Sequence, residues 1–207
     1  MTIRDRILAD VSRETLDRLT VFHDRLVQWT TSINLIAPST IENAWMRHIV
    51  DSAQVFEHFP PDASRHVDLG SGGGLPGLVV ATIAREKRPN LRTILVESDQ
   101  RKAAFLRSVI RELDLDAAVR CSRIEAVTDI VADVVTARAL APLNQLLALV
   151  VPFLAEGGIG LLQKGRQAET EIDLARQVWS FDLVSHISRT ESDARILQIK
   201  DIRRAIS

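Results

Sequence analysis

The sequence predicts an α/β fold: a mostly parallel sheet with helices on both faces, preceded by a helical extension. Two observations predict it. From Val67 onward, short apolar runs alternate with longer amphipathic segments, which is typical of parallel strands connected by helices. The first of these runs, 66 to 68, leads directly into a turn that contains five glycines. We therefore expect an extension at residues 1–61, packed on a second domain at residues 62–207.

The extension is predicted to contain two helices. In its first part, apolar side chains recur every three or four residues, which indicates an amphipathic helix. These side chains are Leu16, Leu19, Phe22, Leu26, Trp29 and Ile33. A second helix is expected to begin at Ser39, because Ser39 and Glu42 have the spacing of a capping box, and to run to about His58. Pro60 and Pro61 end the extension.

The remainder of the chain is predicted to form seven strands and four helices. The strands are expected at 66–68, 92–97, 118–121, 131–137, 159–164, 182–189 and 195–202, and the helices at 76–87, 99–113, 143–155 and 166–179. The last two strands flank Glu191-Ser192-Asp193 and are expected to form an antiparallel hairpin. The sheet is thus expected to be parallel apart from this C-terminal hairpin.

The glycine-rich turn is the strongest indication of a ligand. Its glycines are Gly70, Gly72, Gly73, Gly74 and Gly77. Glycine has no Cβ, so the chain can adopt positive φ and bring backbone N–H groups close to an adenosine or a phosphate. In open α/β sheets this strand-to-helix turn is where ligands bind. The pattern predicts a nucleotide-type cofactor.

Asp68 separates two possible cofactors. Gly72, Gly74 and Gly77 satisfy the GxGxxG pattern of dinucleotide binding, which on its own is weak. A carboxylate at the tip of the first strand can reach an ammonium group or ribose hydroxyls, and NAD offers no ammonium there, whereas S-adenosylmethionine does. The run from Asp68 to Gly74 therefore favours S-adenosylmethionine and a methyltransferase, with NAD as the alternative.

Three further strand tips carry candidate site residues, because ligands lie at the carboxyl ends of such strands. Glu97 ends the second strand, where it could bind both ribose hydroxyls or cap the next helix. Ile124 and Glu125 follow the third strand and could flank an adenine and meet its amino edge. Arg138 ends the fourth strand at the pocket end, with Asp133 at the opposite end, and its charge is expected to serve a ligand.

The segment from Arg47 to Ser52 has two interpretations. On a helix, Arg47 and Asp51 are four residues apart and His48 and Asp51 three apart, so a local ion pair on one face is possible. The segment could dock the extension onto the sheet, or it could line the mouth of the pocket and contact RNA. The sequence does not choose between them.

Net charge is −1, which is not typical of a protein that holds naked nucleic acid by general electrostatic attraction. Three basic clusters still permit an RNA substrate. They are Arg4 and Arg6; Arg101, Lys102, Arg107 and Arg111; and Arg195, Lys200, Arg203 and Arg204. No apolar run approaches the roughly 20 residues of a membrane span, and no signal-peptide core is visible, so we expect a cytoplasmic protein. A lone Cys121 and unpaired histidines predict no metal site.

The sequence also resembles the RsmG (GidB) methyltransferases, which modify N7 of a guanine in bacterial 16S ribosomal RNA. The resemblance covers nearly the whole chain. It is carried by Trp29, Asn34-Leu35, Arg47-His48-Ile49-Val50-Asp51-Ser52, the run from Asp68 to Gly77 with its Gly-Leu-Pro-Gly end, Arg101-Lys102, Phe105-Leu106, Ser122-Arg123-Ile124-Glu125, Arg138-Ala139 and Lys164-Gly165. Glu97 and Thr136 stand where the family often has aspartate and serine.

The resemblance implies a class I, Rossmann-like methyltransferase. It implies a cofactor site at Gly70, Leu75, Ile124, Glu125 and Arg138, with Arg138 also a possible substrate contact. It further implies 16S ribosomal RNA, the small ribosomal subunit or its assembly intermediate as partner. We expect the protein to be a monomer.

Guanine N7 carries an in-plane lone pair, so its methylation needs no residue to remove a proton, and no catalytic residue is assigned. Placement of N7 against the methyl group then provides most of the catalysis. The chain lacks the Asn/Asp-Pro-Pro-aromatic motif of exocyclic-amine methylation. Methylation of a small molecule and NAD-dependent oxidation stay open as alternatives.

Overall fold

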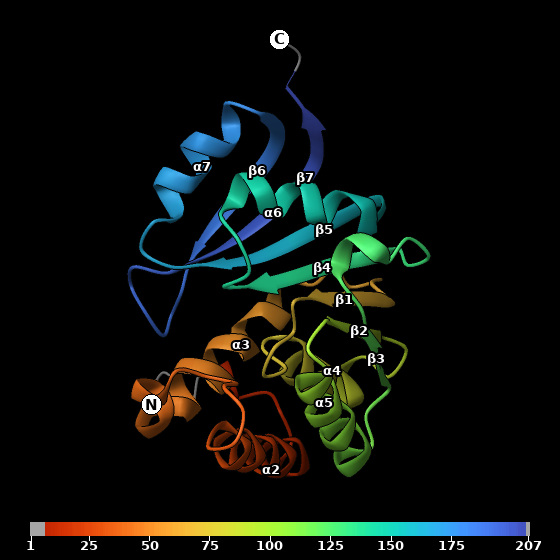
Figure 1. Ribbon diagram of the computed structural model, residues 1–207, viewed down its shortest axis with the longest axis vertical. Helices are drawn as coiled ribbons and strands as arrows, with labels where there is room; N and C mark the ends of the chain where they lie inside the picture. Colours follow the sequence, from red (N-terminus) through yellow and green to blue (C-terminus); the bar gives the residue numbers. More distant parts are fainter. Residues whose placement is uncertain (1–6, 206–207) are drawn as a thin grey trace.

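The protein, seen in a computed structural model that describes residues 7–205, is built around a seven-stranded sheet (Figure 1). The strands are β1 (Arg65–Leu69), β2 (Arg92–Glu97), β3 (Ala117–Cys121), β4 (Ala132–Arg138), β5 (Leu154–Lys164), β6 (Trp179–Ile187) and β7 (Arg195–Arg204). Their order is β3-β2-β1-β4-β5-β7-β6, and β7 runs antiparallel to both of its neighbours. The predicted parallel sheet with a C-terminal antiparallel hairpin is confirmed.

Helices cover both faces of this sheet (Figure 1). On one face lie α2 (Arg13–Thr30), α3 (Asp51–Ala53), α4 (Gly77–Lys87) and α5 (Gln100–Leu113); on the other lie α6 (Leu143–Val150) and α7 (Ala168–Arg176). Because neighbouring residues of a strand point to opposite faces, each strand contributes to two cores. Leu95 packs in the core beneath α4 and α5, whereas Val96 packs in the core beneath α6.

The amphipathic helix of the extension is confirmed as α2. Its N-cap is Ser12, whose side chain accepts a hydrogen bond from the backbone N–H of Thr15. Leu19, Phe22 and Leu26 are completely buried in the core that α2 shares with α4 and α5. The helix ends at Thr30, before the predicted apolar position at Ile33.

The second helical segment of the extension is continuous from Pro38 to His58, ending where the sequence predicts, but it lacks the predicted cap and is not a regular α-helix. The segment instead contains a 3₁₀ turn at Pro38–Asn43, a π-helical turn at Trp45–Val50, the short α3 and a second 3₁₀ turn at Gln54–His58. The capping box is wrong because Pro38 takes the first helical position, which makes Ala37 the N-cap and leaves Ser39 inside the turn.

The π-helical turn also explains why Arg47 and Asp51 do not form the ion pair that a regular α-helix would make possible. A π-helix is wider than an α-helix, so residues four apart no longer stack on one face. Arg47 lies 3.5 Å from Glu191, and Asp51 pairs instead with Arg138 at 3.5 Å.

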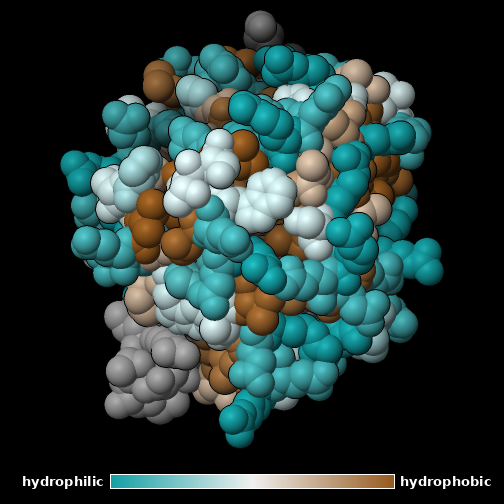
Figure 2. Space-filling view, turned by 60° about the horizontal axis from the view of Figure 1, so that its bottom comes forward, coloured by the Kyte–Doolittle hydropathy of each residue, from teal (hydrophilic) through white to brown (hydrophobic). Residues whose placement is uncertain are grey.

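On the face in Figure 2 the surface is largely hydrophilic, with hydrophobic residues in scattered small groups. Exposed large apolar side chains are similarly dispersed over residues 7–205, from Val21 on α2 to Ile187 at the end of β6. Within these residues, none of the helices has both the length and the apolar composition required to cross a membrane.

Candidate functional site

The glycine-rich loop follows β1 and is held by its own backbone. Gly70, Gly72 and Gly74 have φ values of +66°, +52° and +84°, a region that only glycine adopts readily. The N–H of Gly70 donates to the carbonyl oxygen of Val96 at 2.9 Å, and that of Gly74 to Ser71 at 2.7 Å. The sequence suggested that N–H groups of this loop face a ligand, but these two are already bonded to carbonyl oxygens of the protein. What the loop provides at the cavity is backbone without side chains.

Glu97, at the tip of β2, binds the same loop. Its Oε2 accepts a hydrogen bond from the N–H of Gly72 at 2.8 Å, and its Oε1 accepts one from the N–H of Asp99, also at 2.8 Å. The N-cap of α5 is Asp99, not Glu97. The carboxylate of Glu97 therefore joins two strand-to-helix turns, and its oxygens keep lone pairs for further donors.

Asp68 is completely buried beneath the loop and belongs to a polar chain inside the protein. Thr136 Oγ1 donates to Asp68 Oδ1 at 2.6 Å, and His66 Nε2 lies 2.8 Å from Thr136 Oγ1. Because the Thr136 hydroxyl gives its proton to Asp68, His66 must carry its proton on Nε2 and accept through Nδ1 from Thr93, 3.2 Å away.

Burial determines the protonation states of Asp68 and His66 in this hydrogen-bonded group. Desolvation raises the pKa of Asp68 to about 6, although the hydrogen bond from Thr136 opposes the shift. Burial lowers the pKa of His66 to about 3, so His66 is neutral. Asp68 is 0% exposed and its Oδ2 is buried without a hydrogen-bond partner, so its predicted contact with the cofactor stays a prediction.

A first cavity of about 330 Å³ opens beside the loop, at the carboxyl ends of β1, β2 and β3. Its lining combines bare backbone at Gly70 and Gly72 with the carboxylate of Glu97 and the turn formed by Ile124 and Glu125. These five predicted residues are thus brought together. Ribose hydroxyls could donate to Glu97, and the apolar Ile124 could lie against an adenine.

The other predicted cofactor residues lie outside this first cavity. Gly74 makes the turn into α4 and Leu75 packs into the adjacent core, while Asp68 lies beneath the loop. Arg138 lines a second, larger cavity of about 510 Å³ at the ends of β4, β5 and β7. The two cavities share Ala139 and Leu140 as a common wall.

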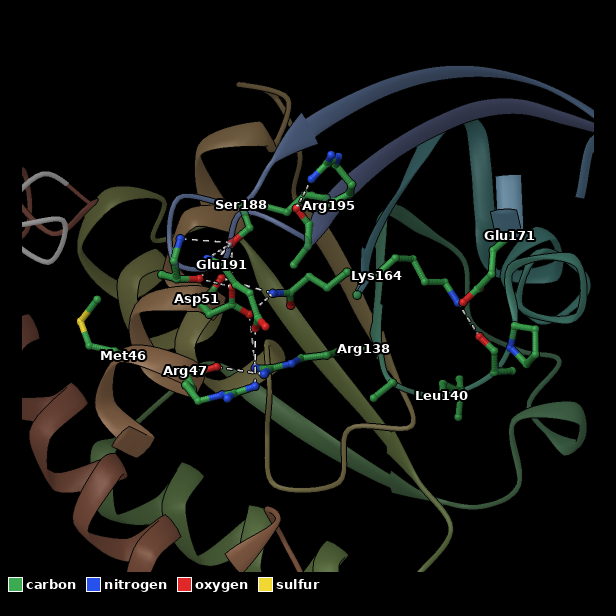
Figure 3. A pocket seen from close by; sticks show the side chains of 18 residues that line it. Met46, Arg47, Asp51, Arg138, Leu140, Lys164, Glu171, Ser188, Glu191 and Arg195 are labelled. Atoms are coloured by element: carbon green, nitrogen blue, oxygen red, sulfur yellow. Dashed lines mark hydrogen bonds and ion pairs between the residues drawn. The ribbon is translucent and has the colours of Figure 1, made fainter. Parts of the chain in front are cut away.

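Arg138 is held by the extension. Figure 3 shows its side chain extending from β4 toward Asp51 and Arg47. Its Nη2 donates to the carbonyl oxygen of Arg47 at 2.9 Å and lies 3.2 Å from Nδ1 of His48, while Nη1 lies 3.5 Å from Asp51 Oδ2. The distant acid Asp51 therefore partners its charge, and the expectation that Arg138 also serves a ligand stays a prediction.

His48 is neutral in this arrangement. Burial, reinforced by the charge of Arg138, lowers the pKa of His48 to about 4. Its Nδ1 faces the guanidinium donor, so the proton lies on Nε2, which donates to Thr40 Oγ1 at 2.8 Å; Thr40 in turn donates to Ala37.

Asp51 is the centre of contacts between the extension and the sheet. Its Oδ1 accepts from Thr190 Oγ1 at 2.6 Å and from Gln54 Nε2 at 2.8 Å, and its Oδ2 from Gln163 Nε2 at 2.7 Å. The segment Arg47–Ser52 thus docks the extension, and Arg47 and Asp51 also line the second cavity. Gln163 and Thr190 belong to no motif that would mark them in the sequence, and neither was predicted as a site residue.

Lys164, a strand-tip residue, extends away from Asp51 toward Glu171 (Figure 3). Its Nζ lies 2.7 Å from Glu171 Oε2 and donates to the carbonyl oxygen of Ala141 at 2.5 Å. Within residues 7–205, His, Cys, Asp and Glu side chains form no group of three or more suited to a metal ion.

Residues 15–199 match GidB, the family described as rRNA small subunit methyltransferase G. The chain belongs to this family. A GidB relative from Ruegeria sp. (strain TM1040), named ribosomal RNA small subunit methyltransferase G, is 45% identical over 201 residues. The alignment covers 97% of this chain and 98% of the relative. The protein is therefore an S-adenosylmethionine-dependent methyltransferase of the GidB family.

Solved structures show that this GidB protein has the class I methyltransferase fold. The mitomycin 7-O-methyltransferase MmcR superposes with a TM-score of 0.61 at 14% identity, over 98% of this chain and 71% of MmcR. A variant of MtNAS in complex with S-adenosylmethionine superposes with a TM-score of 0.58 at 14% identity, over 95% of this chain and 75% of MtNAS.

Proposed function

We propose that this protein transfers the methyl group of S-adenosylmethionine to N7 of a guanine in 16S ribosomal RNA. Membership of the GidB family over residues 15–199 carries this proposal. Its relatives are named for the RNA of the small ribosomal subunit. The small-molecule and NAD alternatives gain no support from these relatives.

The first cavity fits the adenosine part of the donor. Glu97 accepts hydrogen bonds from the ribose hydroxyls, Ile124 lies against the adenine, and Glu125 contacts the amino edge of the adenine. Gly70 and Gly72 leave room for the donor because they line the cavity without a side chain. When bound, the donor supplies an electrophilic methyl group on a sulfonium. Arg138, across the shared wall at Leu140, lies on the substrate side.

The carboxylates around the cavities suit a reaction without proton removal. Among the carboxylates that line the cavities, Glu97, Asp51 and Glu171 each accept hydrogen bonds from protein donors, so none of these three is poised as a general base. N7 of guanine is already nucleophilic. The residues therefore act by positioning the base and excluding water, and such placement can contribute about 7–11 kcal/mol.

Basic side chains at the cavity mouths support an RNA partner. Lys102 and Arg123 line the first cavity, and Arg195 lines the second. Arg4 and Arg6 lie outside the described residues. With a net charge of −1, these local groups rather than the whole surface would bind phosphates. We further propose that the protein acts as a cytoplasmic monomer with a helical extension at 1–61 and a methyltransferase domain at 62–207.

The proposal is tested by incubating the protein with tritiated S-adenosylmethionine and small ribosomal subunits from a strain that lacks the gene. The label is expected in 16S RNA, at a site that borohydride and aniline cleave because its guanine carries an N7 methyl group. Naked 16S RNA and a small-metabolite extract are the parallel substrates. Label in metabolites alone, or in RNA that resists aniline cleavage, would contradict the proposal.

A further inference from the structure

Arg138 and Gln163 are neighbours across two parallel strands. Arg138 of β4 and Gln163 of β5 are Cα partners in the register, so their side chains leave the same face of the sheet. Both side chains contact Asp51 Oδ2, which lies 2.7 Å from Gln163 Nε2 and 3.5 Å from Arg138 Nη1. Both also line the second cavity.

The chemistry of its partners determines how the Gln163 amide is oriented. Its nitrogen lies 2.7 Å from Asp51 Oδ2 and 3.2 Å from the Asp51 carbonyl oxygen, and neither oxygen can donate a hydrogen bond. The NH₂ group must therefore face Asp51, which directs the amide oxygen elsewhere. Gln163 is only 7% exposed, and its Oε1 is buried without a hydrogen-bond partner. A buried acceptor without a donor is costly.

Arg138 provides a matching donor. Its Nη2 is occupied by Arg47 and His48, whereas its Nη1 is buried and makes no hydrogen bond, although Asp51 Oδ2 is close enough for an ion pair. Two residues that line the second cavity thus carry one cationic donor and one neutral acceptor, both buried and without a hydrogen-bond partner. Both are anchored through Asp51 and so have little freedom to move.

We propose that Arg138 and Gln163 recognise the guanine base itself: Arg138 Nη1 donates to O6, and Gln163 Oε1 accepts from N1–H. This inference rests on the proposed function and extends it to the choice of base. O6 and N1–H are adjacent on the guanine ring, as an acceptor beside a donor. Adenine presents the opposite order, an amino donor beside the N1 acceptor, and would leave both protein groups unpaired.

The strand order places N7 on the correct side. Along the sheet, Gln163 lies on β5 and Arg138 on β4, and the next strand is β1, which leads into the glycine loop. On guanine, O6 lies between N1 and N7. A base with N1 at Gln163 and O6 at Arg138 therefore directs N7 toward β1, past Leu140 and into the neighbourhood of the first cavity. A single orientation of the guanine base therefore suits both its recognition and the transfer of the methyl group to N7.

The test exchanges the target guanine in reconstituted small subunits for inosine or for 2-aminopurine and measures single-turnover methylation. Inosine keeps O6 and N1–H, whereas 2-aminopurine lacks both. The wild-type protein is expected to methylate inosine within about threefold of guanine and 2-aminopurine at least tenfold more slowly. Gln163→Met is expected to slow guanine methylation about tenfold or more and to reduce the ratio of guanine to 2-aminopurine rates by a similar factor.

Two controls keep the test decisive. Gln163→Lys removes the acceptor but keeps a donor for Asp51, and it should behave as Gln163→Met does even if the methionine variant is unstable. Gln177→Met, exposed at the end of α7, should match the wild type. Calorimetry with S-adenosylmethionine should give similar affinities for all four proteins.

Two results would overturn the inference. One is a ratio of guanine to 2-aminopurine rates that is the same in wild type and Gln163→Met. The other is a tenfold loss of S-adenosylmethionine affinity in Gln163→Met with that ratio preserved, which would assign Oε1 to the amino-acid end of the donor. If the wild type methylates no guanine N7 at all, the proposed function itself fails, which is a separate outcome.

Discussion

Glu97 Oε2 accepts the backbone N–H of Gly72 at 2.8 Å, so one carboxylate both holds the glycine loop and faces the first cavity. The partner of its second oxygen is Asp99, itself the cap of α5. The loop, the second strand and the next helix are therefore connected through one side chain that is only 8% exposed.

Replacing Glu97 with alanine is expected to weaken S-adenosylmethionine binding by about 1–3 kcal/mol, the range for hydrogen bonds to a charged group. The loop also loses the acceptor for Gly72, so some of this loss reflects a less ordered site. Isothermal calorimetry measures the change in affinity. Glu156→Ala, at an exposed position of β5, is the control for the loss of a carboxylate. An affinity equal to wild type would remove Glu97 from the cofactor site.

Gly70→Val is expected to abolish cofactor binding. At φ +66° a side chain is strained by about 1–2 kcal/mol, and a Cβ would lie only 2.6 Å from Leu140 Cδ1 in the wall shared by the cavities. Gly160→Ala is the matched control, since a Cβ there makes only ordinary contacts, the nearest at 3.6 Å. Calorimetry on protein shown to be folded by circular dichroism decides, and retained affinity in Gly70→Val would refute the prediction.

The buried carboxyl of Asp68 should make stability depend on pH. Its pKa is raised to about 6 in the folded state, so the folded protein binds the extra proton between pH 4 and 6. The stability contributed by protonated Asp68 is therefore full below pH 4 and lost as pH rises through 6. Asp68→Asn, which keeps an acceptor for Thr136, removes this dependence.

Urea unfolding of wild type and Asp68→Asn across pH 4–7 measures the effect. The difference in unfolding free energy should shift in favour of Asp68→Asn by roughly 3 kcal/mol between pH 4 and 6 and stay constant above. His66, whose pKa is lowered to about 3, has the opposite dependence but is common to both proteins and cancels. A constant difference across the range would show that Asp68 titrates normally.

Arg138→Lys is expected to lose both stability and RNA methylation, because a lysine ammonium cannot reach Arg47, His48 and Asp51 in the way that a planar guanidinium does. The side chains of Arg138 and Asp51 are 22% and 13% exposed, so their pair is well shielded from water. A double-mutant cycle with Asp51→Asn should give a coupling of about 1–2 kcal/mol in unfolding free energy.

The cycle also separates two roles of Arg138. Unfolding is compared with methylation of small subunits at low temperature, where every variant is folded. Full methylation by Arg138→Lys under these conditions would show that Arg138 serves only the fold. A coupling near zero would show instead that Asp51 and Arg138 are neighbours without an energetic connection.

The sequence predicted the sheet well because its signals are local. Each strand is a short apolar run, and the helices carry clear periodicity, as in α2 with Leu19, Phe22 and Leu26 on its buried side. The five residues of the first cavity were also predicted, since they follow strands whose carboxyl ends must meet.

Features that depend on contacts between distant residues were not predicted. The turn at Trp45–Val50 is π-helical where His48 and Asp51 bind groups from the sheet and the C-terminal hairpin, and no helical pattern encodes those partners. Gln163 carries no motif either. The position of the Gln163 side chain depends on Asp51, which is 112 residues away in the chain.

The position of β7 has a consequence for synthesis of the protein. β7 is the last strand of the chain, yet it lies between β5 and β6 and is not an edge strand. During translation β6 emerges before the strand that joins it to the sheet, and Ser188 and Thr190, which bind Asp51, precede that same strand. The half of the molecule around the first cavity can assemble on the nascent chain, whereas the second cavity is completed only once β7 has emerged. A chain that terminates before β7 is therefore expected to form the first cavity without the second.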